Sequence, residues 1–347
     1  MSARPSALVT ETLEEYGGMT RALLPVYLPA AEPAKWLWEP VADYPNRGGK
    51  MLRPALCIAA ARAFGGAAEE AARTAVALEL LHNALLVHDD IQDGSELRRG
   101  QPTLHRLHGV PIAINAGDML ALLAIRPLVD NRAALGGDLA LQLLEEAQWT
   151  ARESAEGQAM ELGWRRDHVF DLDSTDYLLM VLKKTCWLTT LCPLRSGALI
   201  GARGRFDPDR LLRFGFFLGA AFQIQDDLLN LLGDAECYGK ERDGDLWEGK
   251  RTLMLIHLLE RAEGGHRERL RALLRRPREE RDAEDVAWLR TEMERHGAIE
   301  AAREVAHGLA GAALHELESI FPAGPSTRDR RFLRELVVWM LERELPK

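Results

Sequence analysis

The sequence has few of the residues that hold small domains together through disulfides or structural metal ions. Four of its 347 residues are cysteine, and Cys57, Cys186, Cys192 and Cys237 show no paired short spacing. This pattern excludes a disulfide framework or a zinc knuckle and is typical of a reducing compartment. Acidic residues exceed basic ones, 53 against 44, which argues against a broad basic surface and against nucleic acid as a partner.

Long uninterrupted apolar runs are also missing. The stretches Gly109–Val129 and Leu211–Leu232 carry charges such as Asp118 and Asp226, so neither offers the roughly 20 clean apolar residues of a membrane span. The N-terminal residues lead to Glu11 rather than to an apolar segment, so no secretory signal peptide is expected. We therefore predict no transmembrane segment and a cytoplasmic location.

Alternating strand patterns are scarce, whereas Ala, Leu, Glu and Arg dominate and favour helices. Apolar residues recur at helical spacing in five segments, which are Glu70–His88, Leu139–Met160, Tyr177–Leu191, Leu211–Leu232 and Leu253–Arg261. Short glycine-rich breaks join them, so we predict an all-α bundle. We expect one domain overall, with residues 1–45 as an N-terminal helical extension of residues 46–347.

A first acidic cluster lies in the segment Val87–Asp93. On a helix, Asp89 and Asp93 are four residues apart, so their carboxylates emerge from one face, with Asp90 beside them. A divalent cation would offset their repulsion, and carboxylate oxygens suit magnesium. Taken alone, however, this short pattern is equally consistent with an acidic helix end on the surface.

A second cluster strengthens the metal hypothesis. Gln223, Asp226, Asp227 and Asn230 are spaced to form one polar stripe on an otherwise apolar helix. Burying carboxylates there is costly unless a cation compensates for them. The alternative is a buried ion pair with Lys or Arg.

Basic residues stand where a polyanion would need them. Lys50 and Arg53 follow the two glycines at 48 and 49, and Arg98 and Arg99 follow the first acidic cluster. Lys184 interrupts an apolar helix. Lys240 and Lys250 flank the turn after the second cluster. Together with the acids they indicate metal-bridged binding of diphosphate groups.

These motifs, taken in order, resemble the trans-isoprenyl diphosphate synthases, the polyprenyl synthetase family, and most closely the bacterial geranylgeranyl diphosphate synthases. The matching stretches are Gly48–Pro54, Leu80–His105, Ala113–Leu120, Gly157–Leu162, Lys183–Thr185, Phe222–Asn230 and Gly244–Met254. Three positions depart from the family pattern, because Met51 replaces an arginine, and Glu161 and Asn230 each replace an aspartate.

The resemblance implies an isoprenoid-synthase helical fold around a central cavity, a homodimer, and magnesium-dependent head-to-tail prenyl transfer between isopentenyl diphosphate and allylic diphosphates. Three magnesium ions are implied, with manganese able to substitute. The implied metal residues are Asp89, Asp93 and Asp226, supported by Asp90, Asp227 and Asn230. The implied allylic diphosphate contacts are Arg98, Lys184 and Lys240, with Lys250 nearby as a further substrate-binding residue. The implied isopentenyl diphosphate contacts are Lys50, Arg53, His82 and Arg99, while Thr185 and Gln223 would face the allylic cation.

The helix face before Asp89 predicts the product length. Ala84 is small and no Phe or Tyr precedes the aspartates, so the prenyl tail should pass Leu85 and extend beyond farnesyl length. Leu81 and Met119, with Leu122 and Leu123 of the next helix, are expected to close the tunnel at geranylgeranyl length, with a longer product as the next possibility. Two other functions remain open, namely a terpene cyclase on the same fold and a regulatory subunit of a heteromeric synthase.

Overall fold

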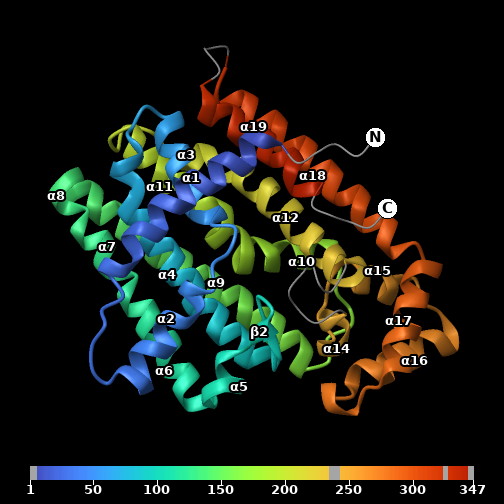
Figure 1. The fold of residues 1–347 in the computed structure, drawn as a ribbon. Coiled ribbons are helices and arrows are strands. Elements are labelled where there is room, and N and C mark those ends of the chain that lie inside the picture. The colour runs from blue at the N-terminus through green and yellow to red at the C-terminus, as the bar shows by residue number, and fades with distance from the viewer. Residues whose placement is uncertain (1–5, 234–242, 323–326, 343–347) are drawn as a thin grey trace.

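The computed structural model describes residues 6–233, 243–322 and 327–342, which are almost entirely helical (Figure 1). The all-α prediction is therefore confirmed. Within these ranges the strands are β1 (Leu97–Arg98) and β2 (Gln101–Pro102), an antiparallel pair with Leu97 opposite Pro102. The helices of the first half are α1 (Ala7–Leu23), η1 (Leu24–Val26), η2 (Ala34–Trp38), α2 (Glu39–Asn46), α3 (Leu52–Ala63), α4 (Ala68–Asp93), α5 (Leu104–His108), α6 (Val110–Leu123), α7 (Ile125–Asp130), α8 (Arg132–Leu135) and α9 (Gly137–Arg166). Those of the second half are α10 (Ser174–Val181), η3 (Leu182–Leu191), α11 (Cys192–Gly201), η4 (Pro208–Leu211), α12 (Leu212–Leu232), α14 (Gly244–Glu248), α15 (Leu253–Arg261), α16 (Gly264–Arg275), η5 (Arg278–Glu280), α17 (Ala283–Arg295), α18 (Ala298–Ile320) and α19 (Arg328–Leu341).

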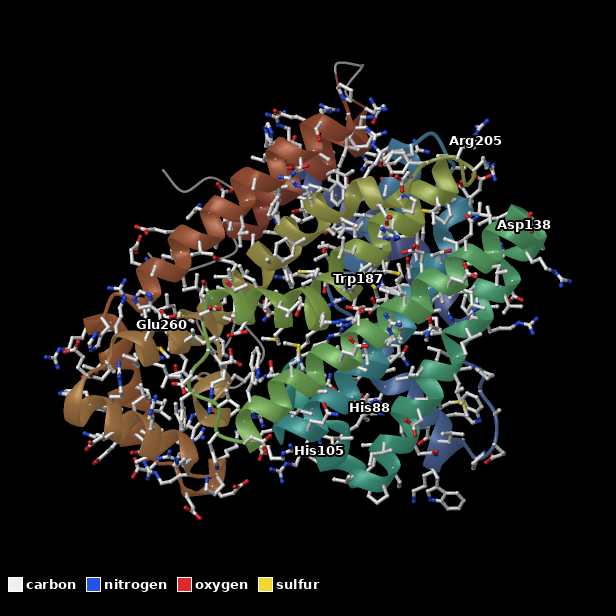
Figure 2. All side chains as sticks on the ribbon, turned by 180° about the vertical axis from the view of Figure 1, so that it is seen from behind. His88, His105, Asp138, Trp187, Arg205 and Glu260 are labelled. Atoms are coloured by element: carbon white, nitrogen blue, oxygen red, sulfur yellow. The ribbon has the colours of Figure 1, made fainter. Side chains whose placement is uncertain are left out.

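Three apolar clusters hold the helices together. One joins α1, α3, α11, α12, α18 and α19; a second joins α10, η3, α12 and α14 to α18; a third joins α2, α4 and α6. In Figure 1, α18 and α19 run along one edge, while α14, α16 and α17 group at the opposite end from α8. Seen from behind in Figure 2, Trp187 of η3 lies near the middle of the bundle, between Glu260 on one side and Asp138 on the other.

The N-terminal segment contains α1 and α2, and α1 is built into the core. Val9, Leu13 and Tyr16 of α1 belong to the same buried cluster as α3 and α19. The buried Tyr16 hydroxyl donates to Asp329 Oδ1 of α19 at 2.5 Å. The segment therefore closes one side of the bundle rather than standing apart from it.

Helix α4 carries the first acidic cluster at its C-terminal end. The Glu70 carboxylate accepts a hydrogen bond from the Ala67 amide and so satisfies one of the unpaired donors at the helix start. The helix ends at Gly94, whose φ of 63° suits glycine and stops further helical turns. Asp89 and Asp93 therefore occupy the last turns before a sharp change of chain direction.

Helix α9 approaches η3 unusually closely. A Cβ atom at Gly157 would lie 2.2 Å from the backbone nitrogen of Lys184, a distance that only glycine permits. Segment η3 has π-helical geometry over Leu182–Leu191, and such segments are frequent at functional sites. The close approach brings Lys184 and Thr185 toward the face of α4 that carries the acids.

Residues 110–135, which comprise α6 to α8, form a helical run long and apolar enough to cross a membrane by length and composition, with 39% of its most apolar stretch buried. The sequence prediction of no such segment is therefore not confirmed by this criterion. The core helix of a soluble protein passes the same test.

Candidate active site

A cavity of about 670 Å³ lies between α4, α9, η3 and α12. It gathers most of the residues that the sequence singles out, although these come from distant parts of the chain. They are Lys50, Arg53, His82, Leu85, Asp89, Arg98, Arg99, Lys184, Thr185, Gln223 and Asp226. Both acidic clusters thus contribute a carboxylate to one cavity.

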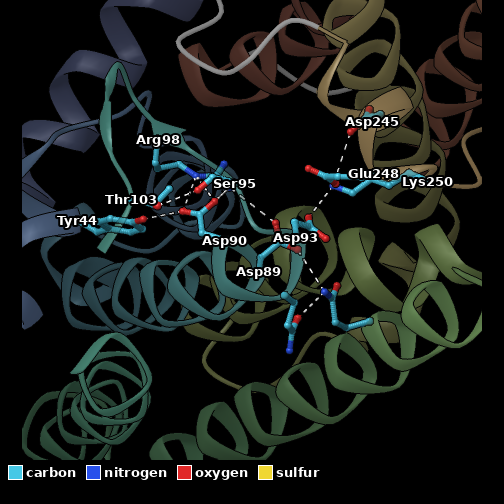
Figure 3. A network of polar contacts seen from close by, with 12 residues as sticks. Tyr44, Asp89, Asp90, Asp93, Ser95, Arg98, Thr103, Asp245, Glu248 and Lys250 are labelled. Atoms are coloured by element: carbon cyan, nitrogen blue, oxygen red, sulfur yellow. Dashed lines mark hydrogen bonds and ion pairs between the residues drawn. The ribbon is translucent and has the colours of Figure 1, made fainter. Parts of the chain in front are cut away.

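Basic groups contact Asp89 and Asp93 of the first acidic cluster, and Figure 3 shows Lys250 beside Asp93. Asp89 Oδ1 lies 3.3 Å from Lys184 Nζ, and Asp93 Oδ2 lies 2.7 Å from Lys250 Nζ. Asp93 Oδ1 also accepts from Arg165 at 2.8 Å. Although burial acts to raise the pKa of Asp93, the nearby cations, Lys250 foremost, hold it below its usual value.

Asp90 points away from this row and is fully buried. Its Oδ2 atom accepts a hydrogen bond from the Tyr44 hydroxyl at 2.6 Å, and Arg98 Nε donates to it at 3.0 Å. Arg98 reaches Asp90 because the β1–β2 hairpin turns at Arg99 and Gly100, where φ is 55° and 74°. Two successive positive φ angles are the geometry of a tight two-residue hairpin turn.

The second acidic cluster likewise has one aspartate that lines the cavity and one that is buried. Asp226 lines the cavity, whereas Asp227 is buried and accepts from the Tyr177 hydroxyl and from Gln223 Nε2, each at 2.7 Å. Burial, followed by the charge of Asp245, raises the pKa of Asp227 to about 8. In each cluster, therefore, the middle aspartate accepts a hydrogen bond from a buried tyrosine.

Asn230, the departure at the end of the second cluster, also has a defined partner. Its Oδ1 atom accepts a hydrogen bond from the backbone amide of Asp245 at 3.1 Å. The side chain thereby fixes the start of α14, and Asp245 lines a small pocket together with Asp89, Asp226 and Asp227. The amide at this position anchors an additional acid beside the two clusters.

Lys184 and Lys250 are partly buried, and each contacts more than one acid. Lys184 Nζ also contacts Glu161 Oε1 at 2.9 Å, so the longer side chain of Glu161 reaches this cation. Lys250 Nζ contacts Glu248 Oε2 at 2.9 Å as well as Asp93. Burial acts to lower the pKa of each lysine, but these acids raise it above the usual value, so both lysines stay charged at neutral pH.

The basic groups at the other end of the cavity form a separate set. Arg53 Nη1 lies 3.1 Å from His82 Nε2, and its Nη2 donates to Thr189 at 2.8 Å. Burial lowers the pKa of Arg53 to about 10, which leaves it positive at neutral pH. Arg99 Nη1 donates to the Tyr44 carbonyl at 2.9 Å, and Lys50 Nζ lies 5.5 Å from the ring of Trp339.

Thr185 and Gln223 meet at the cavity wall. The Thr185 hydroxyl donates to Gln223 Oε1 at 2.9 Å.

Lys240 lies outside the described residues. In the described ranges no three His, Cys, Asp or Glu side chains converge into a group that could hold a metal ion by themselves.

A second, apolar cavity of about 420 Å³ lies one helical turn deeper. Leu81 of α4 and Ala151 of α9 line it, whereas Leu85 and Ala155, one turn further along each helix, line the first cavity. The two spaces therefore follow the same helices. Ala84 and Met119 pack in the core between α4 and α6 and line neither cavity, and Leu122, expected at the tunnel end, is exposed.

Sequence reasoning assigned no role to several residues of this site. Asp245 and Glu248 lie in the motif stretch Gly244–Met254, so that stretch could have indicated them. Tyr44, Arg165 and Tyr177 lie outside every motif and contact the aspartates only through the tertiary fold.

Comparison with known proteins identifies the family. The Polyprenyl synthetase family model matches residues 34–293. A short chain isoprenyl diphosphate synthase of Methanothermobacter thermautotrophicus is 36% identical over 86% of this chain and 87% of its own length. The crystal structure of geranylgeranyl pyrophosphate synthetase from Pyrococcus horikoshii superposes with a TM-score of 0.85 at 31% identity, covering 97% of this chain and 98% of that one.

A bacterial structure is similarly close. The polyprenyl synthase from Caulobacter crescentus, solved with calcium and isoprenyl diphosphate, has a TM-score of 0.85 at 29% identity and covers 99% of both chains. The curated relatives are archaeal, so the expected bacterial likeness is not specific. The chain is a prenyl diphosphate synthase and belongs to the polyprenyl synthetase family.

Proposed function

We propose that this prenyl diphosphate synthase is magnesium-dependent and condenses isopentenyl diphosphate head-to-tail with allylic diphosphates, giving geranylgeranyl diphosphate. The observation that carries the proposal is the single cavity in which Asp89 and Asp226 share a wall with Lys184 and face the separate basic set of Lys50 and Arg53. Such a cavity offers places for two anionic head groups. The names of the relatives support the same reaction class.

The donor set fits magnesium. Carboxylate oxygens are the ligands that hard divalent cations prefer, and Asp89, Asp93 and Asp226 would hold the ions, with Asp90, Asp227 and Asn230 in support. Bound magnesium would supply positive charge to the leaving diphosphate. Three ions remain the expectation, with manganese able to substitute.

Residues of the chain assist ionisation of the allylic substrate. As the carbon–oxygen bond breaks, negative charge grows on the diphosphate, and Lys184, Arg98 and Lys250 stabilise it from fixed positions. Positive charge grows on carbon, where the Thr185 and Gln223 oxygens present dipoles. These interactions strengthen as charge develops, which is what lowers the barrier.

The second substrate is held by the other basic set. Lys50, Arg53, His82 and Arg99 bind the isopentenyl diphosphate group and direct its double bond toward the cation. That double bond attacks the allylic carbon, and the resulting cation then loses a proton to the released diphosphate. No nucleophilic side chain is required.

The deeper cavity is where we place the growing tail. It extends from Leu81 to Thr74, which is about 22 Å from Asp89 along α4 at 1.5 Å per residue. The space continues past Leu81, and this supports a product longer than farnesyl diphosphate. Leu81→Phe should shorten the main product and Leu128→Ala should lengthen it, as measured by chromatographic sizing of hydrolysed products; unchanged products from both variants would contradict this placement.

We also propose a cytoplasmic homodimer. Large apolar side chains are exposed along α6, α7 and α9, namely Val110, Ile114, Leu122, Ile125, Val129, Leu141 and Trp149. Several large exposed apolar side chains on neighbouring elements indicate an interaction surface. A second copy of the chain would cover it.

Purified protein incubated with labelled isopentenyl diphosphate, farnesyl diphosphate and magnesium tests the activity. We expect label in geranylgeranyl diphosphate, with no turnover in EDTA. Release of hydrocarbon from prenyl diphosphate alone would instead indicate a terpene cyclase. Inactivity of the protein by itself, with activity restored by another subunit, would indicate a regulatory subunit.

The metal assignment has its own test. Asp89→Ala should abolish turnover, because it removes a cavity-facing carboxylate, while circular dichroism stays unchanged. Asp138→Ala, at an exposed position on the start of α9, is the matched control and should keep full activity. Full activity of Asp89→Ala would refute the assignment.

A further inference from the structure

A third cavity, of about 1190 Å³, is lined in part by Asp93 and Glu248 and adjoins the first cavity, with which it shares Gln92, Ala159 and Leu162. Its lining residues come from the ends of α4 and α9 and from α14, α16 and η5. Among the described residues, eight arginines line it against four acids. We call it the arginine cavity.

Arg281 is the most unusual of these arginines. Its side chain is 8% exposed, and its hydrogen bonds go only to main-chain carbonyls. Nη1 donates to the carbonyls of Leu246 and Trp247, and Nη2 to those of Leu274 and Arg276. Its Nε atom is buried without a partner, and within the described ranges no carboxylate pairs with it.

Arg251 repeats the pattern beside it. It is 2% exposed, and its Nε and Nη1 donate to the carbonyls of Val169 and Gly249 at 3.1 and 2.6 Å. Its Nη2 atom is buried and unpaired. Burial and then the charge of Arg281 lower the pKa of Arg251 to about 10, so the two guanidinium groups act on each other and both stay charged at neutral pH.

Carbonyl contacts explain where these side chains lie, but not what balances their charge. A buried cation without a counter-charge is costly. The neighbouring Arg165 adds a third positive charge, and its acid, Asp93, is shared with Lys250. Arg275, at the rim, has Phe170 as its contact among the described residues, with the guanidinium carbon 5.2 Å from the ring. Among the described residues, the nearby acids Glu248 and Asp285 are each already paired with another cation, so a bound anion would supply the balancing charge.

We propose that the arginine cavity binds a diphosphate group, at a site separate from the two substrate positions. Planar guanidinium groups with unused N–H donors match phosphate oxygens, and an anion with several negative charges balances several arginines. The identification of the anion as diphosphate rests on the proposed function, because that reaction releases inorganic diphosphate in the adjoining cavity that contains Asp89 and Lys184. The group is either free diphosphate or the head of a prenyl diphosphate.

Equilibrium binding of radiolabelled inorganic diphosphate to the full chain in EDTA tests this site apart from the metal-dependent one. We expect binding by the unmodified protein, and binding about tenfold weaker for Arg281→Gln, since a charge-assisted hydrogen bond is lost. Arg275 is exposed at the end of α16, so Arg275→Gln should weaken binding about threefold without affecting the fold. Arg269→Gln, on the same helix α16 but outside the cavity, and Lys184→Gln, in the substrate cavity, should both bind within about twofold of the unmodified protein.

Unchanged binding by both cavity variants, or loss of binding in Lys184→Gln, would overturn the proposal. Competition with farnesyl diphosphate identifies the source, because displacement at equal concentration indicates a prenyl head group and resistance indicates free diphosphate. If prenyl transfer is absent while the arginine variants still weaken diphosphate binding, the proposed function fails and the arginine cavity stands. If prenyl transfer is present and the arginine variants bind diphosphate normally, the proposed function stands and the proposal for the arginine cavity fails.

Discussion

At the scale of single residues, two buried tyrosines hold one aspartate of each acidic cluster. Tyr44 donates to Asp90 and Tyr177 to Asp227, and both hydroxyl groups are buried. Burial, and then the charge of the partner aspartate, raises the pKa of each tyrosine, so both remain protonated donors. Each acidic helix thus has one aspartate tied to the scaffold, which orients the cavity-facing aspartate next to it.

Removing one of these hydroxyl groups should therefore lower turnover by changing the position of the neighbouring cavity-facing aspartate. Tyr44→Phe leaves a buried carboxylate oxygen without that donor, which we expect to cost about 1–2 kcal/mol of unfolding free energy. Turnover should fall about tenfold, with the magnesium dependence shifted to higher concentration. Tyr27→Phe, which removes a similar bond to Asp130 away from the site, should change stability alone. Equal turnover in the two variants, measured beside urea unfolding, would contradict the positioning role.

At the scale of elements, the contact between α9 and η3 sets the position of Lys184 and Thr185. The contact exists because Gly157 has no side chain at the point where α9 meets the Lys184 backbone. Both elements carry groups of the cavity, so their separation sets the distance between Lys184 of η3 and Glu161 of α9. A larger residue in place of Gly157 would hold α9 and η3 further apart and would displace these side chains.

Gly157→Ala should accordingly impair both stability and activity. The added methyl would overlap the Lys184 backbone, costing about 1–3 kcal/mol, and a displacement of about 1 Å can reduce turnover about a hundredfold. Gly163→Ala on the same helix is the control, because a Cβ there meets nothing within 4 Å. It should stabilise the helix by about 0.5–1 kcal/mol and keep full turnover. Thermal unfolding and initial rates would decide, and a fully active Gly157→Ala would show that the close contact is dispensable.

At the scale of the whole molecule, the exposed apolar side chains of α6, α7 and α9 form the surface on which the proposed dimer rests. The run 110–135 is apolar enough to resemble a membrane helix by composition, yet it carries Asp118 and Arg126, and residues such as Ala113, Ala116 and Leu120 are buried against the third apolar cluster. Only one side of this run thus faces outward. That arrangement favours a second copy of the chain over lipid on all sides.

Ile125→Asp should convert the proposed dimer to a monomer, because it places a charge on this surface. Ile125 is 45% exposed, and Val338 on α19 is 44% exposed on another face, so Val338→Asp is a matched control that should remain dimeric. Light scattering after size-exclusion chromatography in detergent-free buffer gives the mass of each. A monomeric unmodified protein would refute the dimer, and recovery only in detergent would favour a membrane surface instead.

Local pattern determined much of this protein. Helical periodicity and the scarcity of strand residues were sufficient for the all-α fold, since those preferences act within a few turns of chain. Motif spacing was sufficient for the candidate cavity, because Asp89, Asp226, Lys184 and Arg53 lie in ordered stretches that resemble one family. The same reasoning assigned Asp93 to the metal residues and Lys250 to the substrate-binding residues, but it did not predict the direct contact between them.

Tertiary packing decided the rest. Tyr44 and Tyr177 reach their aspartates from helices with no motif, and Arg251 and Arg281 meet from segments about thirty residues apart. Ala84 faces α6 instead of the deeper cavity, because neighbouring positions on a helix face different directions and only the packed partner fixes which one faces the cavity. Sequence pattern specifies what each helix can present, whereas burial against the other helices specifies what it does present.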